Sequence, residues 1–377
     1  MARGNSGDHY DLAVVGAGIV GLATALAAAR RGARVVVLDR DLEARAASVR
    51  NFGFVTVTGQ EAGAMWERAR RSRDVWKEVA EAAGIAITHT GMWMTARRAE
   101  SIAVIEAFMA TDMAEGCRVL SPEEARRRCP QLTGPDLLAV LESTVELRVE
   151  SRLAIPQLAD WLANAHGVRF IRGHTVAEIE PPWLHGTDLK LRADRVAVCP
   201  GDNYQGLYAE RIKQYSLTRC KLQMLRLADP GFKLPAALMS DLGMARNAGY
   251  ANLKAAAALK SRLALEQPEQ VRNGVHLIAV QSADGTLVVG DSHQYTPAPD
   301  CIAHAQIETL ILDEFHAALG VEPPRVLERW VGTYASASDR SVLIDAPHPA
   351  VRLAIVTCGS GASVGFALGE ELAGSLL

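Results

Sequence analysis

Residues 11–39 read DLAVVGAGIVGLATALAAARRGARVVVLD, and this stretch decides the fold of the chain. An apolar run at 12–15 leads into three glycines with G-x-G-x-x-G spacing: Gly16, Gly18 and Gly21. An Ala- and Leu-rich segment follows, then a second apolar run at 35–38 and an acid, Asp39. Strand, glycine-rich turn, helix, strand and carboxylate in this order are typical of a dinucleotide-binding βαβ unit.

Each part of this unit has a physical role in holding a nucleotide. Gly16 permits a tight turn, Gly18 lets the backbone approach a pyrophosphate, and Gly21 lets the helix pack close to the strand. The free N–H groups at the helix start would face the phosphates. Asp39 would accept hydrogen bonds from ribose hydroxyls and would repel a 2′-phosphate, which disfavours NADP. The fingerprint alone does not separate FAD from NAD.

Length and composition are ordinary for a soluble globular protein. The chain of 377 residues is long enough for two domains, and a net charge of −3 gives no reason to expect nucleic acid as a partner. No apolar run reaches the ~18 residues of a membrane-spanning helix. The polar first residues do not look like a signal peptide, and the six cysteines form no C-x-x-C pair. We therefore expect no metal site, no membrane partner and a cytoplasmic location.

Periodicity predicts alternating helices and strands along the rest of the chain. Helices are expected at 61–83, 100–113, 153–165 and 253–265, with a further helix that starts at Ser121-Pro122. Residues 85–94 are expected to form a pair of strands. Later strands are expected at 137–149, 168–171, 175–179, 195–198 and 220–227, and a hairpin around Asp284-Gly285. The middle section thus predicts an antiparallel sheet with helices.

The end of the chain carries a second glycine-rich helix start. A strand at 354–357 is followed by CGSGASVG at 358–365, which leads into a closing helix. An NAD-dependent dehydrogenase has no need for this cluster. In a flavoprotein, its N–H groups and helix dipole would face the part of the isoalloxazine ring that becomes negative on reduction. The cluster therefore favours FAD.

These motifs together resemble the FAD-dependent oxidoreductases of the D-amino-acid oxidase type, which include glycine and sarcosine oxidases. The resemblance is carried over the whole chain by GAGIVG (16–21), Asp39, SVRNFG (48–53), GHTVAEIE (173–180), VAVCPG (196–201) and CGSGASVG (358–365). It implies an α/β two-domain fold, in which a Rossmann-like FAD-binding domain is interleaved with an antiparallel-sheet substrate domain. The FAD-binding domain would comprise 1–90, 146–205 and 326–377, and the substrate domain 91–145 and 206–325.

The resemblance also implies which residues lie along FAD. They are Gly16, Gly18, Ile19, Val20, Gly21, Asp39, Arg40, Ser48, Arg50, Asn51, Phe52, Gly53, Val176, Gly201, Trp330, Gly332, Gly359, Gly361, Ala362, Ser363 and Val364. Covalent flavoproteins of the sarcosine oxidase kind have a Cys before a Tyr-containing motif near the C-terminus. Here that region reads Gly332-Thr333-Tyr334, so we expect non-covalent FAD.

A finer resemblance is to a branch found with aminophosphonate catabolism. It rests on ASVRNFGFVT (47–56), RCKLQM (219–224), GDSHQY (290–295) and RWVGTYA (329–335). The implied substrate is 2-aminoethylphosphonate or an N-methyl derivative, oxidised to an imine that hydrolyses to an aldehyde, with O₂ or another electron acceptor. The Arg that binds the substrate carboxylate in D-amino-acid and glycine oxidases is missing from residues 334–339.

Side chains for this chemistry are expected from several parts of the chain. Candidates at the flavin ring, where catalysis would occur, are Arg50, Asn51, His293 and Tyr334; candidates for binding substrate are Arg219, Arg246, His293, Tyr295 and Tyr334. Either arginine would suit an anionic group. The alternatives are an FAD-dependent oxidase of an N-methyl or D-amino acid, a non-catalytic flavin-binding subunit, or an NAD-dependent dehydrogenase.

Overall fold

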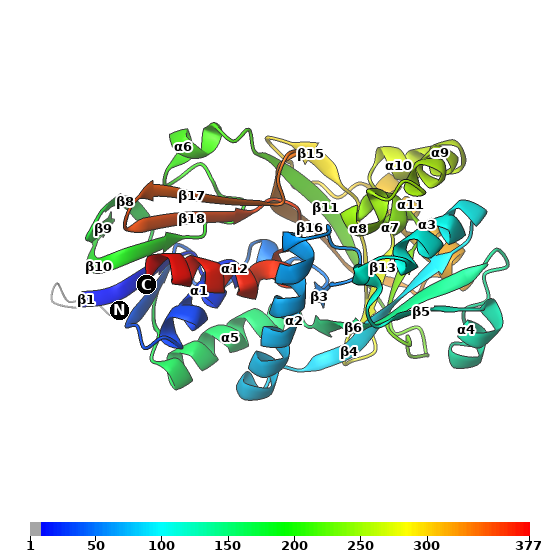
Figure 1. Ribbon diagram of the computed structural model, residues 1–377, viewed down its shortest axis with the longest axis horizontal. Coiled ribbons are helices and arrows are strands. Elements are labelled where there is room, and N and C mark those ends of the chain that lie inside the picture. The colour runs from blue at the N-terminus through cyan, green and yellow to red at the C-terminus, as the bar shows by residue number, and fades with distance from the viewer. Residues whose placement is uncertain (1–8) are drawn as a thin grey trace.

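The computed structural model describes residues 9–377, which form two sheets at opposite ends of an elongated molecule (Figure 1). The smaller sheet has eight strands, six of them in the order β17 (Val342–His348), β18 (Val351–Val356), β10 (Leu189–Val198), β1 (His9–Val15), β2 (Val35–Asp39) and β7 (Arg169–Arg172). Strands β8 (Val176–Glu180) and β9 (Trp183–Gly186) extend it beside β10. Its five central strands, β18 to β7, are parallel, as in a nucleotide-binding domain.

The larger sheet has ten strands and is mainly antiparallel. Its path runs β15 (Gln294–Thr296), β11 (Thr218–Leu227), β14 (Leu287–Gly290), β13 (Ile278–Gln281), β12 (Ala237–Ser240), β4 (Ile87–Ala96), β6 (Ala139–Val149) and β3 (Phe54–Val55). Strand β16 (Val326–Ser336) pairs with β11, and β5 (Cys117–Leu120) pairs with β6. The α/β two-domain fold expected from the sequence is confirmed.

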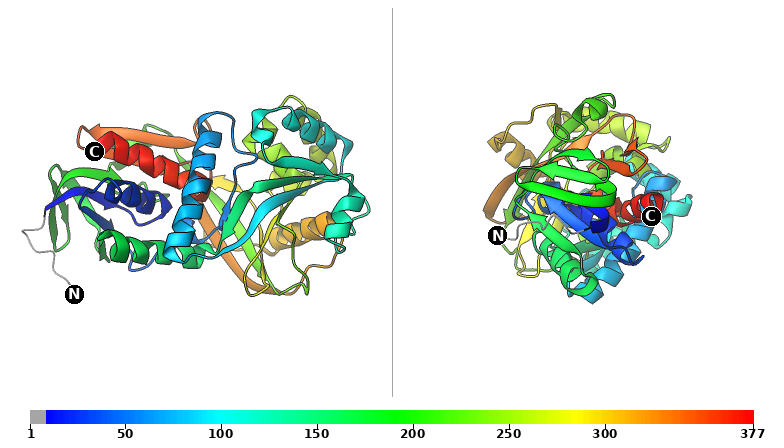
Figure 2. Two further views of the ribbon diagram at one scale, coloured as in Figure 1. Left: turned by 60° about the horizontal axis from the view of Figure 1, so that its bottom comes forward. Right: turned by 90° about the vertical axis from the view of Figure 1, so that its left-hand side faces the viewer.

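The helices divide between the two sheets. Those that contribute to the core beside the smaller sheet are α1 (Ile19–Ala29), α2 (Ala64–Ala83), α5 (Ser151–His166), α6 (Ala209–Lys213) and α12 (Gly361–Leu376). The others are α3 (Ala99–Met109), α4 (Pro122–Arg128), α7 (Leu242–Arg246), α8 (Ala248–Ala251), α9 (Ala256–Glu266), α10 (Pro268–Arg272) and α11 (Ala305–Leu319). Figure 2 shows α2 crossing the molecule beside α12, between the two ends.

Helices α1 and α12, at opposite ends of the sequence, pack against each other along a row of glycines (Figure 1). A Cβ on Gly369 would lie 2.5 Å from the carbonyl carbon of Ala23, and a Cβ on Gly365 would lie 3.0 Å from Cγ1 of Ile19. Only hydrogen fits at these distances. A Cβ on Gly361 would lie 3.7 Å from the same Ile19 side chain, so the two helices also begin side by side.

Most sequence predictions of local structure are confirmed, with two corrections. Helix α4 begins with the expected Ser121 cap, whose hydroxyl accepts from the N–H of Glu124. The expected strand pair at 85–94 is wrong, because β4 is one strand: Gly91, at φ +80°, makes a bulge rather than a turn. The helix expected at 100–113 is also too long, since α3 ends at Met109.

Sheet membership does not follow the domain boundaries expected from the sequence, and these boundaries stay a prediction. Strand β16 and the ends of β4 and β6 belong to the larger sheet although they fall in the expected FAD-binding segments.

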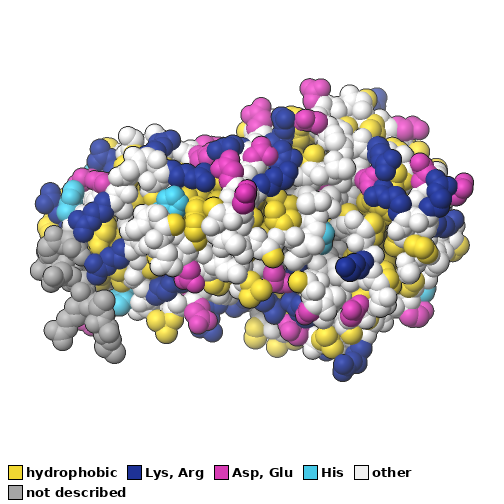
Figure 3. All heavy atoms as spheres, turned by 90° about the horizontal axis from the view of Figure 1, so that it is seen from below, with side chains coloured by type: hydrophobic (Ala, Val, Ile, Leu, Met, Phe, Trp, Pro, Cys, Tyr) yellow, Lys and Arg dark blue, Asp and Glu magenta, His cyan; other side chains and the backbone are white. Residues whose placement is uncertain are grey.

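The described part of the chain has no helix that is long and apolar enough to cross a membrane. All six cysteines are free. Figure 3 shows basic and acidic side chains interspersed over one face, which agrees with the small net charge. This face offers no extended field of one sign to attract a highly charged partner.

Candidate functional site

A cavity of about 630 Å³ connects the starts of α1 and α12 with the larger sheet. Its lining includes Ile19 of α1, the segment from Ala47 to Gly53, and the first residues of α12. The larger sheet and its helices contribute the following side chains: Leu222, Met239, Arg246, His276, Ile278, Asp291, His293, Tyr295 and Tyr334. One cavity thus joins backbone from the nucleotide fingerprint to ionisable side chains from the other end of the molecule.

Two polar contacts hold the fingerprint loop in place, and a third fixes Asp39. Asp39 accepts hydrogen bonds from the backbone N–H of Ala17 at 2.6 Å and of Asp41 at 2.8 Å. Ser48 Oγ accepts from the N–H of Ile19 at 3.0 Å, which joins the 47–53 segment to the start of α1. Asp39 therefore lies at the end of β2 beside the loop, the position expected for a ribose-binding acid.

The glycines of the fingerprint meet different surroundings. A Cβ on Gly16 would lie 2.3 Å from the carbonyl oxygen of Cys199, and one on Gly21 would lie 1.8 Å from that of Gly16. These two glycines are required by the packing of the protein itself. A Cβ on Gly18 would meet only Ser48 Oγ, at 3.0 Å, so the other side of Gly18 has room for a ligand.

The segment from Arg50 to Gly53 is shaped by its own backbone and by β16. Asn51 donates to the carbonyl of Ala47 and accepts from the N–H of Gly53. Trp330 donates to the carbonyl of Arg50 at 3.3 Å, and a Cβ on Gly332 would lie 3.0 Å from the same oxygen. Trp330 and Gly332 thus support this segment from outside and do not line the cavity.

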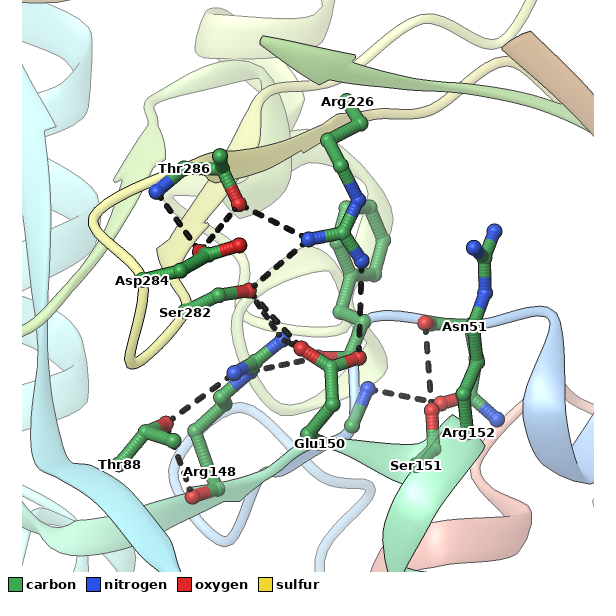
Figure 4. A network of polar contacts seen from close by, with 12 residues as sticks. Asn51, Thr88, Arg148, Glu150, Ser151, Arg152, Arg226, Ser282, Asp284 and Thr286 are labelled. Carbon is green, nitrogen blue, oxygen red and sulfur yellow. Dashed lines mark hydrogen bonds and ion pairs between the residues drawn. The ribbon is translucent and has the colours of Figure 1, made fainter. Parts of the chain in front are cut away.

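A buried ionic network also holds this segment (Figure 4). The side chain of Arg148, at the end of β6, is fully buried and donates to the carbonyl of Phe52 at 3.1 Å. It also bonds Glu150 at 2.8 Å, and Ser282 donates to the same carboxylate. Arg226 of β11 lies on the other side of Glu150 and reaches the hairpin at Thr286. Strands of the larger sheet therefore fix the backbone that lines the cavity.

The start of α12 lies at the opposite wall of the cavity. Ser363 Oγ accepts from the N–H of Thr56, and Trp76 donates to the carbonyl of Ala362 at 2.8 Å. A Cβ on Gly359 would lie 3.0 Å from Cζ of Tyr334, so this loop is in contact with β16. Val364 is buried beneath the helix start and does not line the cavity.

These observations fit FAD. The N-cap residues of α1 and α12, Gly18 and Ser360, make no side-chain hydrogen bond to their own helices. Ser48 occupies the N–H of Ile19 in α1, and other backbone N–H groups at the two helix starts are available to a ligand. Gly18 leaves space at one start, and Gly361, Ala362 and Ser363 line the cavity at the other. FAD is long enough to reach both helix starts at once. A ligand with a phosphate group alone would need only one of them.

At the substrate end, Arg246 and three aromatic rings meet. Arg246, the last residue of α7, donates to the hydroxyl of Tyr295 at 2.7 Å. The rings of His293 and Tyr334 are 6.4 Å apart between centroids. Burial raises the pKa of the Tyr334 hydroxyl well above its usual value, so this group stays protonated. The structure thus brings four sequence-predicted substrate residues together: Arg246, His293, Tyr295 and Tyr334.

Next to them lie Asp291 and His276, two buried residues that the sequence analysis did not identify. Asp291 is 4% exposed and lies between His276 and His293. Burial raises the pKa of the Asp291 carboxyl to about 7, although the positive charge of Arg246 opposes this. Burial, with the charge of Arg246, lowers the pKa of His276 to about 3 and that of His293 well below its usual value. Asp291 could have been suspected from its place two residues before His293; His276 had no such signal.

The remaining predicted residues lie outside the cavity. Arg219 donates to the carbonyls of Asp202 and Pro297 and stacks on Tyr204, so it is not brought to the substrate end. Arg40 is exposed and pairs with Asp41.

Two predicted nucleotide contacts lie on the smaller sheet. Val176 pairs with Gly186 at the start of β8, and Gly201, at φ +60°, follows β10. Their roles toward FAD stay predictions.

Comparison with known proteins identifies the family. The sequence model described as "FAD dependent oxidoreductase", of the DAO family, matches residues 11–374. The chain belongs to this family: it is an FAD-dependent oxidoreductase, and the alternative of an NAD-dependent dehydrogenase is wrong.

The individual proteins that the chain resembles share only a low sequence identity with it. An opine oxidase subunit from Rhizobium meliloti is 24% identical over 328 residues, which cover 77% of this chain and 87% of the relative. Among solved structures, glycine oxidase from Bacillus cereus superposes with a TM-score of 0.77 at 16% identity, covering 97% of this chain and 94% of that one. Iminodiacetate oxidase from Chelativorans sp. gives a TM-score of 0.73 at 20% identity, covering 97% and 95%. These similarities show the same fold.

Proposed function

We propose that the protein oxidises the carbon–nitrogen bond of a small primary or secondary amine that also carries an anionic group. The observation that carries this proposal is Arg246. Arg246 lines the cavity and donates to the hydroxyl of Tyr295, and within residues 9–377 it makes no ion pair with a carboxylate. A guanidinium in this position is suited to an oxyanion of the substrate, which it can bind through two parallel N–H groups.

The residues of the cavity orient this substrate and exclude water. When bound, FAD supplies the acceptor for the hydride on the carbon next to nitrogen. Arg246 and Tyr295 would hold the anionic end, while His293 and Tyr334 would place the amine between Arg246 and the start of α12. Arg50 and Asn51, which belong to the 47–53 segment, would border the flavin ring from the other side of the cavity. The imine then leaves, and water hydrolyses it to an aldehyde with release of ammonia or methylamine.

Among anionic amines, we favour 2-aminoethylphosphonate or its N-methyl derivative. The GDSHQY and RWVGTYA stretches that suggested this branch supply His293, Tyr295 and Tyr334 of the cavity. Arg219, the other candidate for the phosphonate, is already bonded elsewhere, which leaves Arg246.

An N-methyl or D-amino acid is the second candidate. The relatives named as an opine oxidase subunit and as iminodiacetate oxidase favour it, because iminodiacetate is a secondary amine with carboxylate groups. The same Arg246 would bind a carboxylate in place of a phosphonate.

Anaerobic reduction of the purified flavoprotein tests the proposal. Aminoethylphosphonates, N-methyl amino acids and D-amino acids are added in turn, and loss of the flavin absorbance near ~450 nm is followed. We expect rapid bleaching by an anionic amine and recovery of the colour with O₂ or another acceptor. A flavin that no amine reduces would contradict the proposal and favour a non-catalytic flavin-binding subunit.

We also propose that FAD is bound without a covalent link. Cys358 is the cysteine that lines the cavity, and burial raises the pKa of its thiol, which makes the reactive thiolate scarce. Acid precipitation should release all of the flavin into the supernatant. Colour that stays with the precipitated protein would contradict this.

A further inference from the structure

A further inference concerns Asp291, His276 and His293, which we call the Asp–His cluster. The three side chains lie where β13 and β14 meet the cavity, all less than a tenth exposed. His276 Nδ1 is 3.2 Å from Asp291 Oδ1, and His293 Nε2 is 3.6 Å from Asp291 Oδ2. His276 Nδ1 and Asp291 Oδ1 are both buried and bond no other group, so each has only the other as a partner. This leaves Asp291 Oδ2 and His293 Nε2, which lie 3.6 Å apart, as the pair that an N–H group of a ligand could join.

When Asp291 is ionised, the cluster presents acceptors to the cavity. His293 Nδ1 lies 2.9 Å from the carbonyl oxygen of Gly274, which can only accept, so Nδ1 carries the proton. Its neutral ring then turns the lone pair of Nε2 toward Asp291. Asp291 Oδ2 and this nitrogen can therefore receive hydrogen bonds from a ligand with several N–H groups, while Oδ1 lies against His276. A protonated amine is such a ligand.

A metal ion would also use these atoms, which lie within 4.8 Å of one another. The charge of Arg246 acts on all three groups and opposes a bare divalent cation. A zwitterion avoids this conflict, because its anionic group neutralises Arg246 while its ammonium group meets Asp291. The observations therefore favour an ammonium group over a metal.

We infer that Asp291 binds the ammonium group of the substrate and accepts its proton, so that the amine is neutral when it is oxidised. The inference rests on the proposed function and names the residue that prepares the amine. One N–H bond of the ammonium breaks, one O–H bond forms on Asp291, and the nitrogen keeps the electron pair. His276 and His293 position the carboxylate from either side.

The groups around Asp291 are consistent with this role. The ionisable side chains that interact with Asp291 are Arg246, His276, His293 and Cys220, and Tyr295 and Tyr334 line the same cavity. With a pKa of about 7, the carboxyl group of the ligand-free protein is mainly protonated at pH 6 and mainly ionised at pH 8.5. Binding of an ammonium group should therefore expel a proton at the lower pH only.

Calorimetry on the flavin-loaded protein tests this without turnover. The probe is 2-amino-2-methylpropylphosphonate, which has no hydrogen on the carbon next to nitrogen; its hydroxyl counterpart corrects for protons lost from the phosphonate. In buffers of different ionisation enthalpy, the amine should release nearly one more proton than the hydroxyl compound at about pH 6 and nearly none at about pH 8.5. An excess release that does not change with pH, or none at either pH, would overturn the inference.

Asp291→Asn supplies the matched variant. It should keep its flavin and bind the hydroxyl compound within about twofold of the unmodified protein, yet be reduced by the amine at least ~100-fold more slowly. Reduction at the normal rate and with the normal pH profile would overturn the inference while leaving amine oxidation intact. If the proposed function itself fails, no amine reduces the unmodified protein. One tightly bound metal ion per chain would also overturn the inference.

Discussion

The two ends of the cavity are built in different ways. The nucleotide end consists of backbone: two helix starts, three glycines and one carboxylate that braces the loop. The substrate end consists of ionisable and aromatic side chains from a helix and several strands of the larger sheet. Backbone can hold a constant cofactor in many proteins, whereas side chains set what is oxidised. Flavin content and the rate of substrate oxidation should therefore respond to substitutions at different ends of the cavity.

The largest expected effect is on the nucleotide end. Gly18→Val places methyl groups where the pyrophosphate would pass and also crowds Ser48 Oγ, which lies 3.0 Å from the position of a Cβ. We expect the flavin content after purification to fall at least about tenfold. Gly206→Ala is the control, since no heavy atom lies within 4 Å of its Cβ position. Full flavin content in the Gly18 variant would show that the pyrophosphate lies elsewhere.

A smaller, selective effect is expected at the substrate end. Arg246→Met removes the charged donor for the anionic group but leaves the nucleotide end unchanged. We expect normal flavin content and a loss of about 10- to 100-fold in kcat/KM. Arg219→Met is the control, because its guanidinium bonds backbone carbonyls outside the cavity and should change kcat/KM little. Equal losses in the two variants would remove the distinction between these arginines.

The third prediction concerns the network in Figure 4, which lies between the two ends. Arg148→Met would leave the carboxylate of Glu150 and the carbonyl of Phe52 without their buried donor. We expect a loss of about 3–5 kcal/mol in the free energy of unfolding, measured by denaturant titration. Arg152→Met breaks an exposed pair with Glu328 and should cost less than about 1 kcal/mol. A similar small loss for both would show that the buried network does not hold the cavity wall.

The sequence was informative where short-range rules apply. The fingerprint at 16–21 and the capped helix at Ser121 depend on residues a few positions apart, so their spacing predicted them correctly. Gly91 shows the limit even at short range, since a glycine can make either a turn or a bulge.

The substrate end could not be predicted in full because it depends on strand order. His276 and Asp291 come together only because β13 and β14 pair, and the backbone of these two residues exchanges hydrogen bonds at the end of the ladder. Arg219 and Arg246 are equally plausible in sequence, but β11 turns the first away from the cavity while α7 delivers the second to it. Long-range packing therefore decides which arginine can meet a substrate.

A crystal structure of the flavin-loaded protein would test the central claim most directly. The account predicts one FAD with its pyrophosphate at Gly16–Gly21 and its ring between the start of α12 and the side chains of Arg246 and Asp291. A ring far from α12, or separated from Arg246 by the wall of the cavity, would contradict it.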